Sequence, residues 1–95
     1  AKEHVSYRYD FIYVNEFDYP MIVIEFQGNQ YHLRESELQS RKHDTDPHGR
    51  LLVEGYQTDI DKKKFINGMY PDCKFFYIWE DSIEENIQQI IDTIP

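Results

Sequence analysis

The chain has few of the features that mark secreted, membrane or disordered proteins. Its 95 residues contain one cysteine, Cys73, so no internal disulfide can form, and a reducing cytosol is the expected compartment. No apolar run approaches the roughly 20 residues of a membrane span. Aromatic residues make up 16% of the chain, which is untypical of a disordered tail. We therefore expect a single small cytoplasmic domain over residues 1–95, without membrane contact.

Positive charge is also scarce, because ten Lys and Arg face eighteen Asp and Glu, for a net charge of −8. Nucleic-acid binders usually have a basic surface, so this total argues against DNA as a partner. The charges are unevenly placed along the chain. Residues 34–74 contain eight of the ten basic side chains, whereas residues 75–95 contain five acids and no Lys or Arg. The middle of the chain is therefore the part suited to phosphate contacts.

Hydrophobic periodicity and turn residues divide the chain into strands and helices. Clusters of β-branched and aromatic residues predict strands at 7–14, 21–26, 30–33 and 74–79. Apolar residues at helical spacing predict helices at 51–69 and 83–94, the second capped by Ser82. We expect an antiparallel hairpin from the first two strands and a long loop over 34–50 with one helical turn around Ser36–Gln39. The expected fold class is α/β, in the order β-β-β-α-β-α.

Two carboxylates stand where apolar side chains are expected. Glu25 lies near the end of the apolar run 21–26, and an ionised carboxylate there is costly unless it is paired or bound to a metal. Asp10 lies in the middle of an aromatic strand, where Asp is uncommon. On neighbouring strands the two could hold Mg²⁺ together with waters and phosphate. The alternative is structural, with Asp10 paired to Arg8 and Glu25 solvated at a strand end.

Three further polar residues have the chemistry of phosphoryl transfer. His32 follows the break at Gly28, and an imidazole can accept a proton from water near neutral pH. Asp59 and Lys62 are three residues apart and so share one face of the expected helix. A lysine near a metal-bound phosphate would stabilise developing charge. Each also has an ordinary interpretation, as a surface histidine and as part of a solvated charge run.

Taken in order, these residues resemble the core of the PD-(D/E)xK nucleases. Asp10, followed by Ile24–Gly28 and Gln30–His32, is similar to the very-short-patch-repair-like (Vsr-like) branch. That branch carries an E-D-x-H-D set and includes phage homing endonucleases. Its helix signature, Asp-x-x-Lys-x-x-aromatic, matches Asp59, Lys62 and Phe65, and its closing strand and helix match residues 77–80 and 82–94. The resemblance implies a restriction-endonuclease-like core, a mixed β-sheet flanked by helices.

The resemblance further implies a Mg²⁺-dependent DNA endonuclease domain of homing type, in which Mn²⁺ can substitute. Asp10 would anchor the metal, and Glu25 and the Phe26 carbonyl would be further ligands. The family's leading Glu normally comes well before the first strand, and Glu3 is the candidate in this chain. Because the chain begins at Ala1, we expect a C-terminal fragment whose upstream part holds a DNA-binding arm. A homodimer is left open.

The resemblance also assigns the water-activating groups and the DNA contacts. His32 would activate the attacking water, Asp59 would support His32, and Lys62 would contact phosphate. Gln27 occupies the position where many of these nucleases have a catalytic Lys, so His32 or Lys62 would take over that role. Double-stranded DNA would lie against the basic residues of the central stretch, namely Arg34, Arg41, Lys42, Arg50, Lys63 and Lys64.

Two other functions compete with the nuclease. The net charge suggests an acidic binding module that mimics DNA, and the carboxylates are also compatible with an inactive nuclease fold used for protein interaction. A metal cluster at His43 and His48 is disfavoured, because their spacing matches no closed zinc site. Cys73 as a nucleophile lacks an obvious base.

Overall fold

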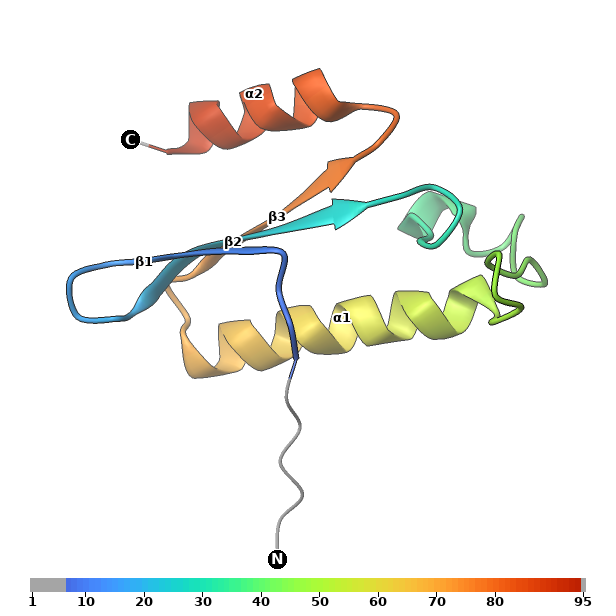
Figure 1. Cartoon of the computed structure of the whole chain (residues 1–95), viewed down its shortest axis with the longest axis horizontal. Coiled ribbons are helices and arrows are strands. Elements are labelled where there is room, and N and C mark those ends of the chain that lie inside the picture. Colours follow the sequence, from blue (N-terminus) through green and yellow to red (C-terminus); the bar gives the residue numbers. More distant parts are fainter. Residues whose placement is uncertain (1–6, 95) are drawn as a thin grey trace, which may run out of the picture.

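The computed structural model describes residues 7–94 and is built on a mixed three-stranded sheet with the strand order β1-β2-β3. β1 pairs antiparallel with β2, and β2 pairs parallel with β3. Figure 1 shows helix α1 on one face of the sheet and helix α2 on the other. The elements are β1 (Phe11–Val14), β2 (Pro20–Gln27), a 3-10 turn η1 (Glu35–Glu37), α1 (Leu52–Met69), β3 (Lys74–Trp79) and α2 (Ile83–Thr93). The predicted α/β class, hairpin and mixed sheet are therefore confirmed.

The structure differs from the predicted order at one strand. Residues 30–33 form no strand, so the order is β-β-α-β-α rather than β-β-β-α-β-α. The backbone N–H groups of Tyr31 and His32 both donate to the Gly28 carbonyl, at 3.1 Å. This turn directs the chain away from the sheet and provides its own backbone hydrogen bonds. As a result, His32 stands beyond the end of β2 instead of within a ladder.

The first strand is also shorter than predicted, because residues 7–10 lie outside the ladder. At this point a side chain replaces the missing backbone partner. The N–H of Phe26 donates to Oδ2 of Asp10 at 2.8 Å. An aspartate that seemed misplaced inside a strand therefore lies just outside it, where its carboxylate satisfies a backbone donor that would otherwise have no ladder bond.

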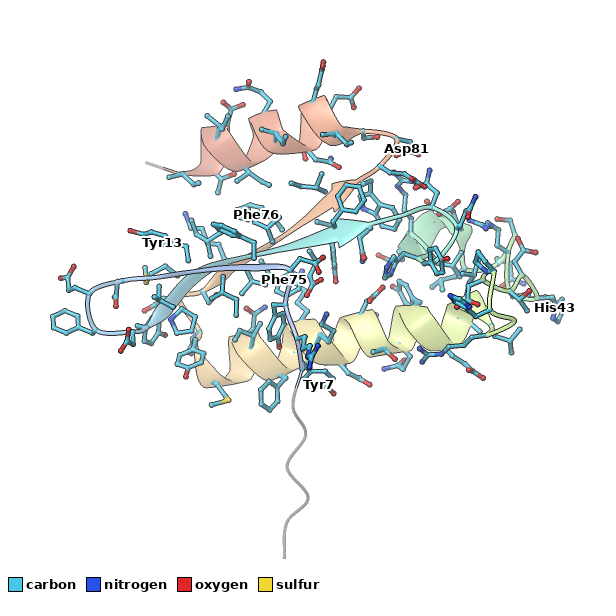
Figure 2. The ribbon with its side chains drawn as sticks, viewed as in Figure 1. Tyr7, Tyr13, His43, Phe75, Phe76 and Asp81 are labelled. Atoms are coloured by element: carbon cyan, nitrogen blue, oxygen red, sulfur yellow. The ribbon has the colours of Figure 1, made fainter. Side chains whose placement is uncertain are left out.

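Alternation along β2 separates the two faces of the sheet. Val23, Glu25 and Gln27 are buried, whereas Phe26 on the opposite face is 48% exposed. The core on the α1 side joins Val23 to Ile66 and Cys73. In Figure 2, Phe75 of β3 points toward α1 and Phe76 points toward α2, as expected for successive strand residues.

Helix α2 begins after Ser82, as predicted, but the Ser82 side chain makes no capping hydrogen bond to the helix backbone. Its hydroxyl donates to Asp81 instead, at 3.0 Å. Ile90 is the buried residue of α2. Neither helix in the described range 7–94 combines the length and apolar character needed to cross a membrane.

Candidate functional site

The two out-of-place carboxylates meet at the end of β2. Asp10 precedes β1 and is exposed, whereas Glu25 on the α1 face is 7% exposed. The Asp10 side chain is anchored by the Phe26 N–H, which brings it beside Glu25. The alternative Asp10–Arg8 pair does not occur among the ion pairs of the described residues.

Glu25 is paired with a lysine of α1. The Nζ of Lys62 lies 2.7 Å from Oε1 of Glu25, and the side chains are 18% and 9% exposed, respectively. At this distance the Lys62 ammonium engages one lone pair of Oε1. A carboxylate has about four lone-pair sites, so others remain for a ligand. The Lys62 side chain therefore partly neutralises Glu25 without saturating it.

Burial and the neighbouring carboxylate both shift the pKa of Glu25. Its pKa is raised first by burial and further by the neighbouring Asp10 carboxylate, while the Lys62 ammonium opposes the rise. Two close carboxylates disfavour each other's ionisation unless a cation offsets their charge. Perturbed carboxylates of this kind concentrate at functional sites. The pair is therefore poised to gain from a bound cation.

A second polar cluster lies beside the first. Nδ1 of His32 is 2.9 Å from Oδ2 of Asp59, and the Gln27 side-chain amide donates to the same oxygen at 3.2 Å. Gln27 is 3% exposed and the Asp59 side chain is 13% exposed. When Nδ1 carries the proton, it donates to Asp59 and Nε2 is left as an acceptor. Asp59 and Gln27 thus orient the imidazole with one nitrogen able to accept a proton.

The His32–Asp59 cluster lines a cleft that Lys62 connects to the carboxylate pair. A cavity of about 370 Å³ is lined by His32, Asp59 and Lys62, with Tyr31, Arg50 and Thr58 among its other residues. Lys62 also contacts Glu25, so its side chain connects the cleft to the carboxylate pair. A group bound in this cleft would meet an imidazole, an ammonium and a carboxylate together.

The residues fit a hard divalent cation. Mg²⁺ is typically held by one or two carboxylates, with waters and substrate phosphate completing the shell. The Phe26 carbonyl can contribute, because the N–H and C=O of one strand residue point to the same side, and the Phe26 N–H points toward Asp10. Among residues 7–94 there is no cluster of three or more His, Cys, Asp or Glu arranged as metal ligands. Asp10 and Glu25 would therefore hold a metal together with non-side-chain oxygens.

The predicted DNA-contacting residues divide into paired and unpaired cations. Arg34 pairs with Asp81 and lowers its pKa to about 2. Arg41 pairs with Glu37 and with Asp44. Arg50 likewise pairs with Glu54 at 3.5 Å, whereas Lys42, Lys63 and Lys64 form no ion pair with any described residue. Each of the three arginines would therefore reach phosphate only by leaving an acidic partner.

Tyr9 is a site residue that the sequence did not single out. Its hydroxyl donates to the Lys62 carbonyl at 2.9 Å, and the Lys62 Nζ lies 5.2 Å from the centre of its ring. The ring thereby helps hold the ammonium at Glu25. No local pattern in the sequence marked Tyr9, because the contact joins residues 53 apart in the chain.

Three other sequence candidates lie elsewhere in the fold or outside the described residues. His43 is at the far end of the long loop, away from the sheet (Figure 2). Cys73 is buried in the core, and burial raises the pKa of its thiol, which disfavours the reactive thiolate. Glu3, the candidate for the family's leading Glu, lies outside the described residues.

Comparisons with protein-family models, curated proteins and solved structures found no match to this chain.

Proposed function

We propose that the chain is a metal-dependent endonuclease domain that hydrolyses phosphodiester bonds of double-stranded DNA, as in an intracellular endonuclease of homing type. The observation that carries the proposal is the convergence of two clusters at the end of β2. The Asp10–Glu25 carboxylates and the His32–Asp59 pair are linked through Lys62 and the cleft that it lines. A metal site beside a water-activating imidazole is the arrangement that phosphodiester hydrolysis requires.

Each residue has a defined part in the reaction. Asp10, Glu25 and the Phe26 carbonyl would hold Mg²⁺ or Mn²⁺, which supplies charge neutralisation at the scissile phosphate. Nε2 of His32 accepts the proton of the attacking water while Asp59 stabilises the imidazolium that forms. The water oxygen bonds to phosphorus, the opposite P–O bond breaks, and the leaving oxygen takes a proton from solvent.

Many of the resembled nucleases have a catalytic lysine at the position of Gln27. In this chain Lys62 would supply the charge of that lysine, and Gln27 would orient Asp59. The Gln27 amide cannot carry charge, and it is occupied in orienting Asp59. Lys62 comes from α1 instead and places its ammonium at 2.7 Å from Glu25. Because Lys62 also lines the cleft, its ammonium would be free to contact the phosphate there if a bound cation offset the charge of Glu25.

Affinity for DNA would come largely from elsewhere in the full protein. Nonspecific affinity depends on Lys and Arg contacts to phosphate, and this chain has a net charge of −8. We therefore propose that a basic DNA-binding arm delivers the domain to its target. The isolated domain should bind duplex DNA poorly at physiological salt.

The test is cleavage of supercoiled plasmid by the domain fused to a DNA-binding module, with Mg²⁺ or Mn²⁺ against chelator. Asp10→Asn and His32→Ala should each lower the cleavage rate by about 10²-fold or more. Asp72→Asn, an exposed carboxylate at the turn before β3, is the matched control and should cleave normally. The proposal fails if DNA remains intact under every metal condition, or if the two site variants cleave as fast as the control.

An acidic binding module is the second candidate, favoured by the net charge of −8 and by the pairing of Arg34 and Arg41 with acids. It would occupy a basic DNA-binding site of another protein. An inactive nuclease fold used for interaction predicts the same lack of cleavage. Calorimetric titration with Mg²⁺ separates these from the nuclease, because binding abolished by Asp10→Asn and by Glu25→Gln is expected only for the nuclease.

A further inference from the structure

A second, larger cavity adjoins the proposed catalytic cleft. Its volume is about 760 Å³, and its lining comes from α1, from the ends of β2 and β3 and from residues 33–35. Asp59 belongs to the lining of both cavities, and Gln27, which donates to Asp59, lines the larger one. This volume is within the range of pockets that bind small ligands. Whatever binds here would lie next to the phosphate that the cleft would hold.

One wall of this cavity is aromatic. Tyr56 from α1 and Tyr77 and Trp79 from β3 line it, and the Tyr77 and Trp79 rings are 6.5 Å apart. Burial raises the pKa of Tyr77 to about 12, so its hydroxyl stays a hydrogen-bond donor at neutral pH. The Arg34 guanidinium lies 4.1 Å from the centre of the Trp79 ring. Planar rings and a guanidinium plane are the surfaces on which single nucleobases stack.

The rim of the cavity is basic, although the whole chain is acidic. Lys63 and Lys64 line it from α1, and both are exposed and form no ion pair with a described residue. Two carboxylates also line the cavity. Asp59 is engaged by His32 and Gln27, and Glu35 is exposed at the edge. The unpaired ammonium groups therefore favour a ligand that joins an aromatic body to an anionic group.

We propose that this cavity binds one unpaired nucleotide of the DNA substrate, with its base against the aromatic wall and its phosphate between Lys63 and Lys64. The inference rests on the proposed function and adds a requirement to it. Bases inside a duplex cannot reach such a wall, so the nucleotide next to the scissile phosphate is either flipped out or already unpaired. The substrate class is thus DNA distorted or unpaired beside the cleavage point.

The binding test requires no cleavage. Trp79 is the only tryptophan of the chain, so its fluorescence reports on the cavity directly. Deoxyadenosine 5′-monophosphate is titrated into the domain in chelator, with inorganic phosphate and deoxyadenosine as the two half-ligands. We expect the nucleotide to change Trp79 emission saturably, and to bind at least about tenfold more tightly than either half, because stacking and phosphate contacts contribute together.

Variants assign the binding to the cavity. The double variant K63Q/K64Q should weaken nucleotide binding by about tenfold, and Tyr56→Leu should weaken it by about fivefold or more through lost stacking. Lys74→Gln is the matched control, since Lys74 lies at the start of β3 with its ammonium 3.3 Å from the Thr93 carbonyl. The exposed lysine variants should leave the fold intact, as circular dichroism would verify.

The outcomes separate this proposal from the proposed function. Saturable nucleotide binding that K63Q/K64Q weakens supports the cavity assignment, even if no DNA is cleaved. Equal binding of phosphate and nucleotide would overturn it, because the aromatic wall would then contribute nothing. Metal-dependent DNA cleavage together with no emission change up to millimolar nucleotide would also overturn it, and would leave the nuclease proposal standing.

Discussion

The two faces of the sheet use the same three strands for opposite chemistry. Along β2, Glu25 and Gln27 point to the α1 side and are at most 7% exposed, whereas Phe26 on the α2 side is 48% exposed. The α1 side thus buries a charged residue and an amide while an aromatic ring stays in solvent. A protein optimised only for stability would exchange these positions. The inversion is the arrangement expected if the α1 face binds the proposed metal and substrate.

The α2 face is held by aliphatic packing and contains no buried charge among the described residues. Ile90 is 7% exposed, and Ile83, Ile87, Ile91 and Ile94 remain 41–56% exposed. On the α1 face, by contrast, Lys62 and Glu25 and the His32–Asp59 contact bridge helix and sheet. Substitutions on the α2 face should therefore change stability alone, and substitutions on the α1 face should change stability and ligand response together.

The largest stability effect is expected on the α2 face. Ile90→Ala should lower the free energy of unfolding by about 3 kcal/mol, because it removes a buried side chain and leaves a cavity. Urea denaturation measures the loss. Ile91→Ala, one residue along and 56% exposed, is the control and should stay within about 0.5 kcal/mol. Equal losses in the two variants would mean that α2 is not packed through Ile90.

A slightly smaller effect is expected from the ion pair on the α1 face. Lys62→Met should cost about 2 to 3 kcal/mol, since it leaves the Glu25 carboxylate buried without its cation. Adding Glu25→Gln to the same chain should recover more than half of that loss. The exposed Lys63→Met is the control. If the double variant is no more stable than Lys62→Met alone, the cost comes from packing of the lysine stem and not from charge.

The smallest expected change in stability, and the most diagnostic one, is the dependence of the Glu25→Gln variant on pH and on metal. Because the folded-state pKa of Glu25 is raised by burial, its contribution to stability is present at low pH and is lost as the pH rises through that pKa. Glu25→Gln should therefore be more stable than the native chain at neutral pH, by up to about 1 kcal/mol. The advantage should disappear on acidification, as thermal melts across pH would show.

Saturating Mg²⁺ should reverse the order of stability at neutral pH, so that the native chain becomes more stable than Glu25→Gln. The cation would stabilise the ionised Glu25 of the native chain, whereas Glu25→Gln lacks one carboxylate ligand and should gain little. Ile90→Ala should retain the full Mg²⁺ response, since its site is on the other face. A Mg²⁺ response of the same size in Glu25→Gln would contradict a role for this carboxylate as a ligand.

Much of the fold could be predicted from the sequence, because strand and helix positions depend on the pattern of neighbouring residues. The strand Lys74–Trp79 and the helix ending at Met69 occur at their predicted positions. The segment 30–33 was mispredicted, since an extended-looking pattern could not show that Gly28 reverses the chain. The Ser82 cap was mispredicted for a similar reason, because its hydroxyl has Asp81 as a competing partner.

The candidate site was accessible only as a set of residue types. Asp10 and Glu25 were identifiable because carboxylates are rare in apolar strands, and Asp59 and Lys62 because helical spacing places them on one face. Nothing in the spacing showed that Gln27 and His32 would share one oxygen of Asp59. That contact joins residues 32 apart in the chain, and such distances are decided by packing.

The sequence alone determined the charge distribution, the strand alternation and the helix periodicity, since each of these is a property of neighbouring residues. Tertiary structure decided which charges remain available to a ligand. It paired Arg34 and Arg41 with acids, placed Lys62 on Glu25, and left Lys63 and Lys64 at the rim of an aromatic cavity. The physical reason is that pairing and burial depend on distance in space, which sequence separation does not fix.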